Sequence, residues 1–289
     1  MAAAACGLPV ALHADNFTLS ERERERLKAE GRRDLRALDL LRRTPATPEG
    51  TAKALLFAHH AGAHLHVAHI ALSAPECVGL VREAKRRGHR VTAECPPVFL
   101  TLEDLDRVGP YGLPFALPRE EIHFYWRALA DGTLDALATD HAPHTAEEKA
   151  PGWKDVWQAP TGYPVVELLL PIALTKMQEG LLGLRELVRM TAEAPARILG
   201  LYPRKGVIRV GSDADLTLVD LKRRRVVRAE NLKSKAGWSP FEGCLLQGWP
   251  VATLLRGRVV MREGEILAEG GYGQFLTPLG RAEEVHTPA

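Results

Sequence analysis

The sequence places one carboxylate and two imidazoles close together at the end of a short apolar run. Residues 133–139 have strand length and are followed by Asp140, His141 and His144, in loop sequence that contains Pro143. We therefore expect Asp140 at the carboxyl end of a buried strand, where α/β barrels place catalytic groups. An Asp there could bind a metal ion, take a proton from water, or do both in turn. Because an Asp that caps a turn is the simpler alternative, the functional interpretation depends on the rest of the chain.

Two other imidazoles, His13 and His69, repeat the pattern of a short apolar run followed by polar side chains. His64 and His66 lie earlier in the run that leads to His69, and on a strand they would share one face. They resemble a metal-binding pair, but they lie away from the strand end where chemistry is expected, so we predict packing roles for them. His69 is the better candidate for a functional residue.

The elements that must position these residues alternate between strand and helix. Strands are expected at 8–12, 63–70, 89–95 and 133–139, and helices at 20–43, 47–60, 75–87, 118–130 and 164–200 with breaks. This alternation predicts a parallel sheet covered by helices. The sequence changes to short β runs after Pro203, so we predict two parts, residues 1–203 and a β-rich part at 204–289. The Trp-containing loop at 145–161 is long enough to be a functional cover of the site.

Composition excludes several classes of protein. The chain has 289 residues, 46% of them hydrophobic and 26% charged, with a formal net charge of +2, so neither nucleic acid nor a membrane surface is an expected partner. Its four cysteines are far apart, which favours a reducing cytoplasm over a disulfide framework. The first twelve residues lack the basic leader of a signal peptide, and no segment approaches the roughly 18 apolar residues of a membrane span.

Seven short motifs, taken in order, resemble those of one family, the metal-dependent cyclic amidohydrolases, which include dihydroorotase, allantoinase and dihydropyrimidinase. Each motif alone is weak evidence, but their number and order make the resemblance specific along nearly the whole chain. The motifs are His13-Ala14-Asp15-Asn16, His66-Val67-Ala68-His69-Ile70, Ala93-Glu94-Cys95-Pro96, Thr139-Asp140-His141-Ala142-Pro143-His144, residues 194–201, residues 206–215 and residues 238–243.

The resemblance implies a fold and a chemistry. The family fold is a (β/α)8 barrel with a small β-sandwich, and the reaction is hydrolysis of a cyclic amide at two metal ions, usually zinc. By resemblance, His13 and His69 would be metal ligands, and Asp140 would be the metal-binding general base. Imidazole and carboxylate are suitable zinc ligands, which fits this assignment.

The same resemblance implies where the substrate would bind. His144 stands where dihydroorotases keep a residue that contacts the substrate carboxylate, and Thr161 and Gly162 lie in the loop whose backbone lines the ring site. Two departures leave the substrate open, because Asp15 replaces the usual Glu and residues 97–99 lack the usual aromatic or His pair. The Asp-His-Ala-Pro-His motif favours dihydroorotase, whereas the motifs at 93–96 and 238–243 fit hydantoinases and allantoinases equally well.

Only four strand–helix units precede the β-rich part, whereas a closed barrel has eight. We therefore expect the last four units of a (β/α)8 barrel followed by a small β-sandwich segment. In the family the first half supplies a His-x-His pair and a carboxylated lysine, so one zinc ion or none would bind here, against one or two in a complete site.

Three hypotheses follow from the half barrel. The first is the carboxyl-terminal part of a cyclic amidohydrolase that needs the other half for activity. The second is a non-catalytic homologue that acts as an assembly partner, and the third is a one-metal hydrolase of altered substrate. The expected partners are a small cyclic amide or ureide, and either a second copy of this chain or a complementary barrel half.

Overall fold

The computed structural model describes residues 1–72 and 74–279 of the chain. Its residues group into two compact units. Unit 1 contains residues 1–169 and 226–245, and unit 2 contains residues 170–225 and the chain from 246 onward. The predicted domain boundary at residue 203 stays a prediction, since compactness alone places residues 226–245 with the first part of the chain.

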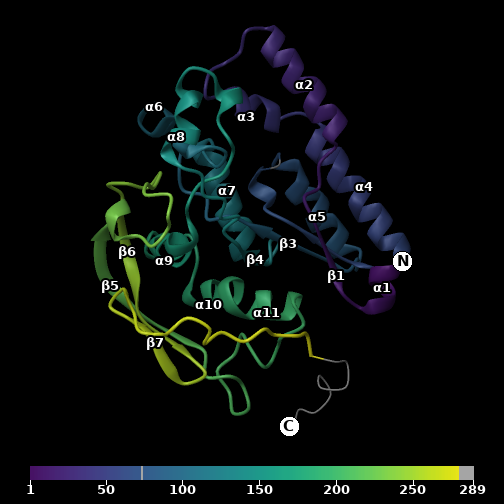
Figure 1. The fold of residues 1–289 in the computed structure, drawn as a ribbon. Coiled ribbons are helices and arrows are strands. Elements are labelled where there is room, and N and C mark those ends of the chain that lie inside the picture. Colours follow the sequence, from purple (N-terminus) through teal and green to yellow (C-terminus); the bar gives the residue numbers. More distant parts are fainter. Residues whose placement is uncertain (73, 280–289) are drawn as a thin grey trace. The chain divides into compact units, whose positions relative to one another are not determined.

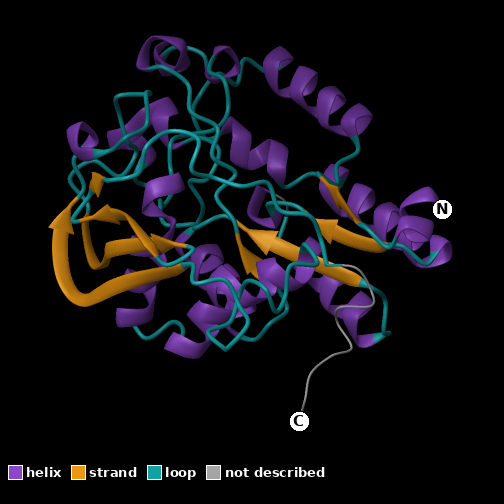
Figure 2. Ribbon diagram, turned by 60° about the horizontal axis from the view of Figure 1, so that its bottom comes forward, coloured by secondary structure: helices purple, strands orange, loops and turns teal. Residues whose placement is uncertain are grey.

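Unit 1 is built on a parallel sheet of four strands. The strands are paired in the order β1-β2-β3-β4, which is also their order in the chain. Figure 1 labels β1, β3 and β4, and Figure 2 draws the strands in orange and the helices in purple. They are β1 (Pro9–Leu12), β2 (His64–Val67), β3 (Val91–Cys95) and β4 (Ala136–Leu137). The predicted parallel sheet is therefore confirmed, and each strand lies inside the range expected for it. β4 is much shorter than expected, because only Ala136 and Leu137 pair with β3.

Helices connect these strands and pack against them. α4 contacts β2 and α5, and α5 contacts β3 (Figure 1). The helices of unit 1 are α1 (Ala2–Cys6), α2 (Phe17–Ala29), α3 (Ala37–Arg42), α4 (Ala46–Ala61), α5 (Glu76–Arg86), α6 (Leu105–Val108), α7 (Arg119–Ala130) and α8 (Ala146–Lys149). Its described 3-10 turns are η1 (Ile70–Leu72), η2 (Gly109–Gly112), η3 (Ala150–Trp153), η4 (Val156–Gln158), η5 (Val166–Leu168) and η7 (Ala229–Asn231). The predicted continuous helix over 20–43 is wrong. It breaks after Ala29 because Gly31 adopts a left-handed conformation and Asp34 binds the backbone N–H of Arg36.

The two faces of the sheet in unit 1 differ in polarity. Val91, Ala93 and Cys95 of β3 are buried on one face, and Thr92 and Glu94 are half-buried on the other. Strand alternation accounts for this division, because successive side chains point to opposite faces. The sheet therefore has one apolar face and one polar face.

The apolar interior of unit 1 also takes in the aromatic side chains of α7. Tyr125 and Trp126 are fully buried, and the indole N–H of Trp126 donates to the backbone carbonyl of Val98. The buried indole therefore has a hydrogen-bond partner, as such groups usually require.

Unit 2 combines three helices with a second sheet. The helices are α9 (Leu169–Gln178), α10 (Leu184–Val188) and α11 (Ala194–Ile198), with a π-helical turn at Arg189–Glu193 between the last two. The strands, paired in chain order, are β5 (Leu216–Val226), β6 (Leu245–Leu255), β7 (Arg258–Arg262) and β8 (Glu265–Ile266). β6 with β7 and β7 with β8 are antiparallel.

These strands confirm that residues after 203 are rich in β-structure. An α/β fold with one parallel and one antiparallel sheet is therefore established. Within residues 1–72 and 74–279, none of the helices has the length and apolar character needed to cross a membrane.

Candidate active site

The three predicted metal-binding residues all follow strands of the parallel sheet. His13 comes directly after β1, His69 comes two residues after β2, and Asp140 comes three residues after β4. Because the strands are parallel, their carboxyl ends lie at the same edge of the sheet. This edge is where ligands bind in open α/β sheets and in α/β barrels.

His13 and His69 meet at this edge although 56 residues separate them in the chain. Nδ1 of His13 and Nε2 of His69 are 3.0 Å apart, and the ring centroids are 4.6 Å apart. The other ring nitrogen of His69, Nδ1, is buried and has no hydrogen-bond partner. Two imidazoles with converging nitrogens and one unsatisfied nitrogen are an arrangement that a cation could organise.

Asp140 acts electrostatically on the same cluster. Burial lowers the pKa of His69, the negative charge of Asp140 opposes this shift, and His13 adds to it. The neutral imidazole is the form that can bind a metal ion, so the lowered pKa favours ligation.

The backbone at His69 and Asp140 is unusual. His69 has φ of 35° and Asp140 has φ of 45°, both in the left-handed region that residues other than glycine rarely adopt. Such conformations cost free energy and persist where the surrounding structure holds them, often at functional sites. Among the residues of unit 1 that the structure describes, the two non-glycine residues with positive φ are therefore residues that the sequence predicts as functional.

The packing of α4 fixes the turn that carries His13. A Cβ on Gly50 of α4 would lie 2.7 Å from the backbone carbonyl carbon of Asp15, so only glycine allows this approach. The Ser20 hydroxyl donates to one carboxylate oxygen of Asp15, at 2.7 Å, and the other oxygen is buried without a partner. Asp15 is thus held between Ser20 of α2 and Gly50 of α4, two residues after His13.

The polar face of the sheet carries a second group of side chains. The Thr92 hydroxyl lies 2.9 Å from Nε2 of His64 and 2.9 Å from Nδ1 of His66, and Nε2 of His66 lies 3.1 Å from Glu94. These contacts occupy the ring nitrogens of His66 with protein partners. They agree with the prediction that this histidine pair packs in the sheet.

The arrangement of His13, His69 and Asp140 provides only some of the ligands that a metal ion needs. His13 and His69 converge, but within residues 1–72 and 74–279 the structure contains no cluster of three or more His, Cys, Asp or Glu side chains that could hold a metal ion. The residues present therefore supply a pair of imidazole ligands, and Asp140 contributes charge from nearby. A closed metal site would need at least one more ligand.

The predicted substrate-binding residues lie in two segments that follow β4. His144 accepts a hydrogen bond on its backbone carbonyl from the Trp238 indole at 2.8 Å, and its ring lies 3.5 Å from Glu148. Thr161 is exposed and Gly162 is buried. A Cβ on Gly162 would lie 2.6 Å from the Cβ of Ala142, so the two segments are in close contact.

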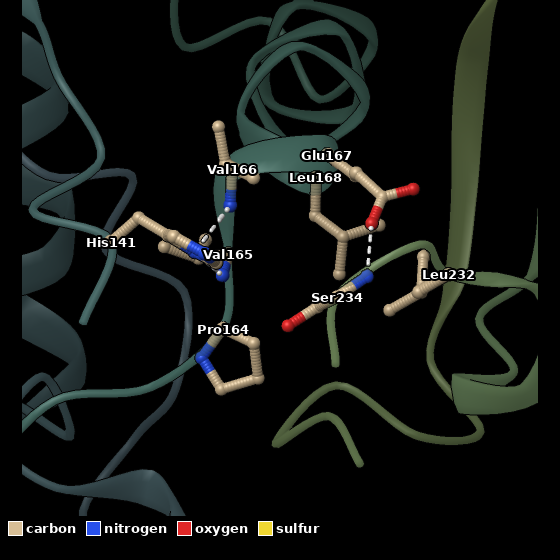
Figure 3. A pocket seen from close by; sticks show the side chains of 8 residues that line it. All are labelled: His141, Pro164, Val165, Val166, Glu167, Leu168, Leu232 and Ser234. Carbon is tan, nitrogen blue, oxygen red and sulfur yellow. Dashed lines mark hydrogen bonds between the residues drawn. The ribbon is translucent and has the colours of Figure 1, made fainter. Parts of the chain in front are cut away.

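Two residues that organise these segments received no specific role from the sequence: His141 was noted only as part of the motif, and Lys149 was not noted. His141 accepts hydrogen bonds on Nδ1 from the backbone N–H groups of Val165 and Val166, at 3.0 and 3.2 Å. It lies beside a shallow pocket together with Glu167, whose carboxylate accepts from the backbone N–H groups at 233 and 234 (Figure 3). The other residue is Lys149, which is fully buried. A lysine directly after two glutamates is the only sequence signal for it, and that pattern is usual on solvated helices.

Comparison with known proteins identifies relatives along most of the chain. The sequence model of the family described as "Amidohydrolase family" matches residues 1–260 of this chain. L-hydantoinase of Paenarthrobacter aurescens is 39% identical over 280 residues, which are 95% of this chain and 60% of that protein. Dihydroorotase of Methanosarcina mazei is 39% identical over 234 residues, which are 77% of this chain and 50% of that protein.

Solved structures give the same result for the fold. The L-hydantoinase (dihydropyrimidinase) from Arthrobacter aurescens superposes with a TM-score of 0.91 at 39% identity, covering 96% of this chain and 62% of that chain. The dihydropyrimidinase from Brevibacillus agri superposes with a TM-score of 0.88 at 27% identity. This chain thus spans about 60% of the length of the L-hydantoinase that it matches.

Proposed function

This chain belongs to the amidohydrolase family, and on that premise we propose that it forms part of a metal-dependent enzyme that hydrolyses a cyclic amide. The observation that carries the proposal is the convergence of His13 and His69 at the carboxyl edge of the parallel sheet, within the electrostatic reach of Asp140. Related proteins with the names L-hydantoinase and dihydroorotase support the substrate class.

Each residue has a proposed task in the reaction. His13 and His69 would hold a divalent cation, zinc being the proposal, through their converging nitrogens. The cation supplies Lewis acidity, which polarises an amide carbonyl. Asp140 is the proposed general base, because a carboxylate beside the ligands can take a proton from the attacking water and pass it to the amide nitrogen.

The remaining proposed residues bind the substrate ring. His144 would pair with an acidic group on the substrate, since an imidazole can carry a positive charge at near-neutral pH. Thr161 and Gly162 would line the ring site. The Gly162 N–H donates to the carbonyl of Leu113, but the Gly162 carbonyl oxygen, which accepts from Lys149, has a second lone pair that could accept from a ring N–H.

A six-membered ring with a carboxylate, as in dihydroorotate, is the substrate that the Asp-His-Ala-Pro-His segment favours. The second candidate is a hydantoin ring. It is favoured by the L-hydantoinase relative, which matches 95% of the chain, whereas the dihydroorotase of Methanosarcina mazei matches 77%. Allantoin, a ureide on the same ring, is the third substrate to include in assays.

The four parallel strands are the proposed last part of a (β/α)8 barrel. Among the residues that the structure describes, β1 pairs with β2 only, so one of its edges has free backbone groups, and β4 ends the other side of the sheet. Val10 and Leu12 of β1 are 38% and 39% exposed, and Leu56 and Phe57 of α4 are 64% and 65% exposed. A strand with a free edge and exposed apolar neighbours is a surface that another strand–helix unit can cover.

The proposed partners follow from these edges. Either a complementary barrel half or a second copy of the chain would supply the covering strands and additional metal ligands. None of the four cysteines, all of them within the described residues, forms a disulfide, which favours the cytoplasm as the proposed location because its conditions are reducing.

The test is a ring-opening assay on this chain with zinc, alone and mixed with the first barrel half of the L-hydantoinase relative. We expect hydrolysis of dihydroorotate or a hydantoin in the mixture, and loss of that activity when the chain carries His69→Ala. Tight, metal-independent binding to a full-length amidohydrolase with no hydrolysis in any mixture would instead support a non-catalytic assembly partner.

A further inference from the structure

Lys149, at the end of α8, is a charged residue that has no exposed surface. Its relative exposure is 0%, although lysine is almost never fully buried. Removing an ammonium group from water costs free energy, and the cost is reduced only by close polar partners. Such a residue therefore needs a structural or functional reason.

The partners of Lys149 are two backbone carbonyls from distant segments. Its Nζ donates to the carbonyl of Gly162 at 2.7 Å and to the carbonyl of Leu113 at 3.2 Å. The backbone N–H of Gly162 also donates to the carbonyl of Leu113, at 3.2 Å. The lysine thus closes a small ring of hydrogen bonds around Gly162.

Lys149 also lies near the segment that carries His144. Its Nζ is 5.9 Å from the centre of the Trp238 ring, and the indole N–H of Trp238 donates to the backbone carbonyl of His144. A cation at that distance from an indole face is attracted to it. The lysine is therefore linked on one side to Gly162 and on the other to His144.

The helix that carries Lys149 is anchored independently. Thr145 and Glu148 form a capping box, in which the Thr145 side chain accepts from the Glu148 N–H and the Glu148 side chain accepts from the Thr145 N–H. Such reciprocal caps fix the start of a helix. Because the N-cap residue Thr145 directly follows His144, the cap sets the direction in which the lysine side chain enters the interior.

We propose that Lys149 is a positioning residue, which holds the backbone of Gly162 against Ala142 and so sets the spacing between the two segments proposed to bind the substrate. The substrate part of this inference rests on the proposed function. The main-chain part rests on the contacts of Lys149 alone.

Packing shows why the position of Gly162 matters. Its φ is +106°, and a Cβ there would lie 2.6 Å from the Ala142 Cβ and 2.8 Å from the Ala142 carbonyl. Ala142 is two residues from Asp140 and two from His144. A displacement of Gly162 would therefore change the environment of both residues. Burial lowers the pKa of Lys149 to about 7, in keeping with an interior location.

The experiment compares amide hydrogen exchange in the wild-type chain with that in Lys149→Met and Lys149→Gln variants. Met keeps the length of the side chain and removes the donors, whereas Gln keeps two N–H donors. We expect exchange at Gly162 at least about tenfold faster in Lys149→Met, as for loss of a charge-assisted hydrogen bond, and partial recovery in Lys149→Gln. Exchange in β2 should not change.

Lys154→Met is the matched control, because Lys154 lies in the same loop and is exposed. Unchanged exchange at Gly162 in Lys149→Met, or equal acceleration in Lys154→Met, would overturn the proposal. If Lys149→Met does not fold, Lys149→Gln is the test variant. The proposal then requires faster exchange at Gly162 in Lys149→Gln than in the wild type, with unchanged protection in β2, and wild-type exchange at Gly162 would overturn it.

A ring-opening assay with the completed barrel separates this inference from the proposed function. Positioning predicts a KM raised about tenfold in Lys149→Met with kcat within about threefold, because the ring is held less well while the cation and base remain. An unchanged KM would overturn the substrate part. Absence of hydrolysis by the wild type, together with the expected exchange pattern, would refute the proposed function and support the main-chain part.

Discussion

The two sheets of this protein use the same rare backbone conformation for different purposes. In unit 2, Arg256 and Glu263 have φ of 48° and 52°, and each is followed by a glycine with positive φ. Each pair forms the two-residue loop of a hairpin, β6–β7 or β7–β8, where left-handed residues match the twist of the strands. In unit 1, His69 and Asp140 have similar φ values but follow parallel strands.

The difference between the hairpin loops of unit 2 and the strand ends of unit 1 shows where a strained backbone indicates function. A hairpin loop of two residues requires positive φ, so Arg256 and Glu263 are explained by local geometry. No tight turn between paired strands requires it at His69 or Asp140, and there the conformation brings polar side chains to the carboxyl edge of the sheet. Strain without a local cause, at residues whose side chains could bind a metal ion or move a proton, favours a site in unit 1.

Substitution of Asp140, one of the two strained non-glycine residues described in unit 1, is expected to have the largest effect on activity. Asp140→Asn keeps the size of the side chain and removes the proposed base, so ring hydrolysis by the completed barrel should fall by about 10³-fold. The control is Glu263→Gln in the hairpin, which should leave kcat unchanged. Equal rates for Asp140→Asn and the wild type would remove Asp140 from the proposed chemistry.

A pair of glycines gives the next largest effect. Gly162→Ala would force a Cβ to 2.6 Å from Ala142 at φ of +106°, so unfolding in urea should show a loss of about 3 kcal/mol from strain and overpacking. Gly264→Ala also has positive φ, but no atom lies within 4 Å of its Cβ, and about 1 kcal/mol is expected. Equal losses would mean that the contact with Ala142 carries no free energy.

The buried lysine predicts how stability depends on pH. Burial lowers the pKa of Lys149 from 10.5 to about 7, so between these pH values the unfolded chain binds a proton that the folded chain does not. Stability from this group therefore rises with pH across the window, by about 2 kcal/mol between pH 7 and pH 9.

Denaturant titrations of the wild type and Lys149→Met at several pH values measure this contribution. The difference between their unfolding free energies should change across the window and stay constant below about pH 6. A difference that is independent of pH from 7 to 9 would show that Lys149 keeps its ordinary pKa.

The smallest effect is expected in the hairpin of unit 2. Glu263→Asn gives the β7–β8 loop the Asn-Gly sequence that such turns favour, and it removes an exposed ion pair with Arg223. The two changes oppose each other, so the unfolding free energy should change by less than about 0.5 kcal/mol. A large loss would show that this turn depends on the ion pair more than on its backbone conformation.

Much of the sheet in unit 1 could be predicted from the sequence because its signal is local. Short apolar runs that end in polar residues located β1, β2 and β3, and the alternation of strand and helix gave the parallel sheet. The length of β4 could not be predicted, since pairing with β3 rather than residue type ends it after Leu137. The helix break after Ala29 was not predicted, because charged residues continue on both sides of Gly31 in the pattern of a solvated helix, and its left-handed conformation has no other local signal.

The sequence allowed the candidate site residues to be predicted, but not the contacts between them. Strand ends and motifs pointed to His13, His69 and Asp140, but the 3.0 Å approach of the two imidazoles depends on packing across 56 residues. The role of Lys149 could not be inferred, because both carbonyls that it binds come from other segments of the chain. The grouping of residues 226–245 with unit 1 is likewise a long-range effect.

The most direct test of the central claim, that the carboxyl edge of the parallel sheet forms a cation site, is calorimetric titration of zinc into four proteins. They are the wild type, His13→Ala, His69→Ala and the matched control His64→Ala, which removes an imidazole from the polar face of β2. We predict that zinc affinity falls at least about tenfold in His13→Ala and His69→Ala and is unchanged in His64→Ala. Equal affinity in all four proteins, or a loss in His64→Ala alone, would contradict the account.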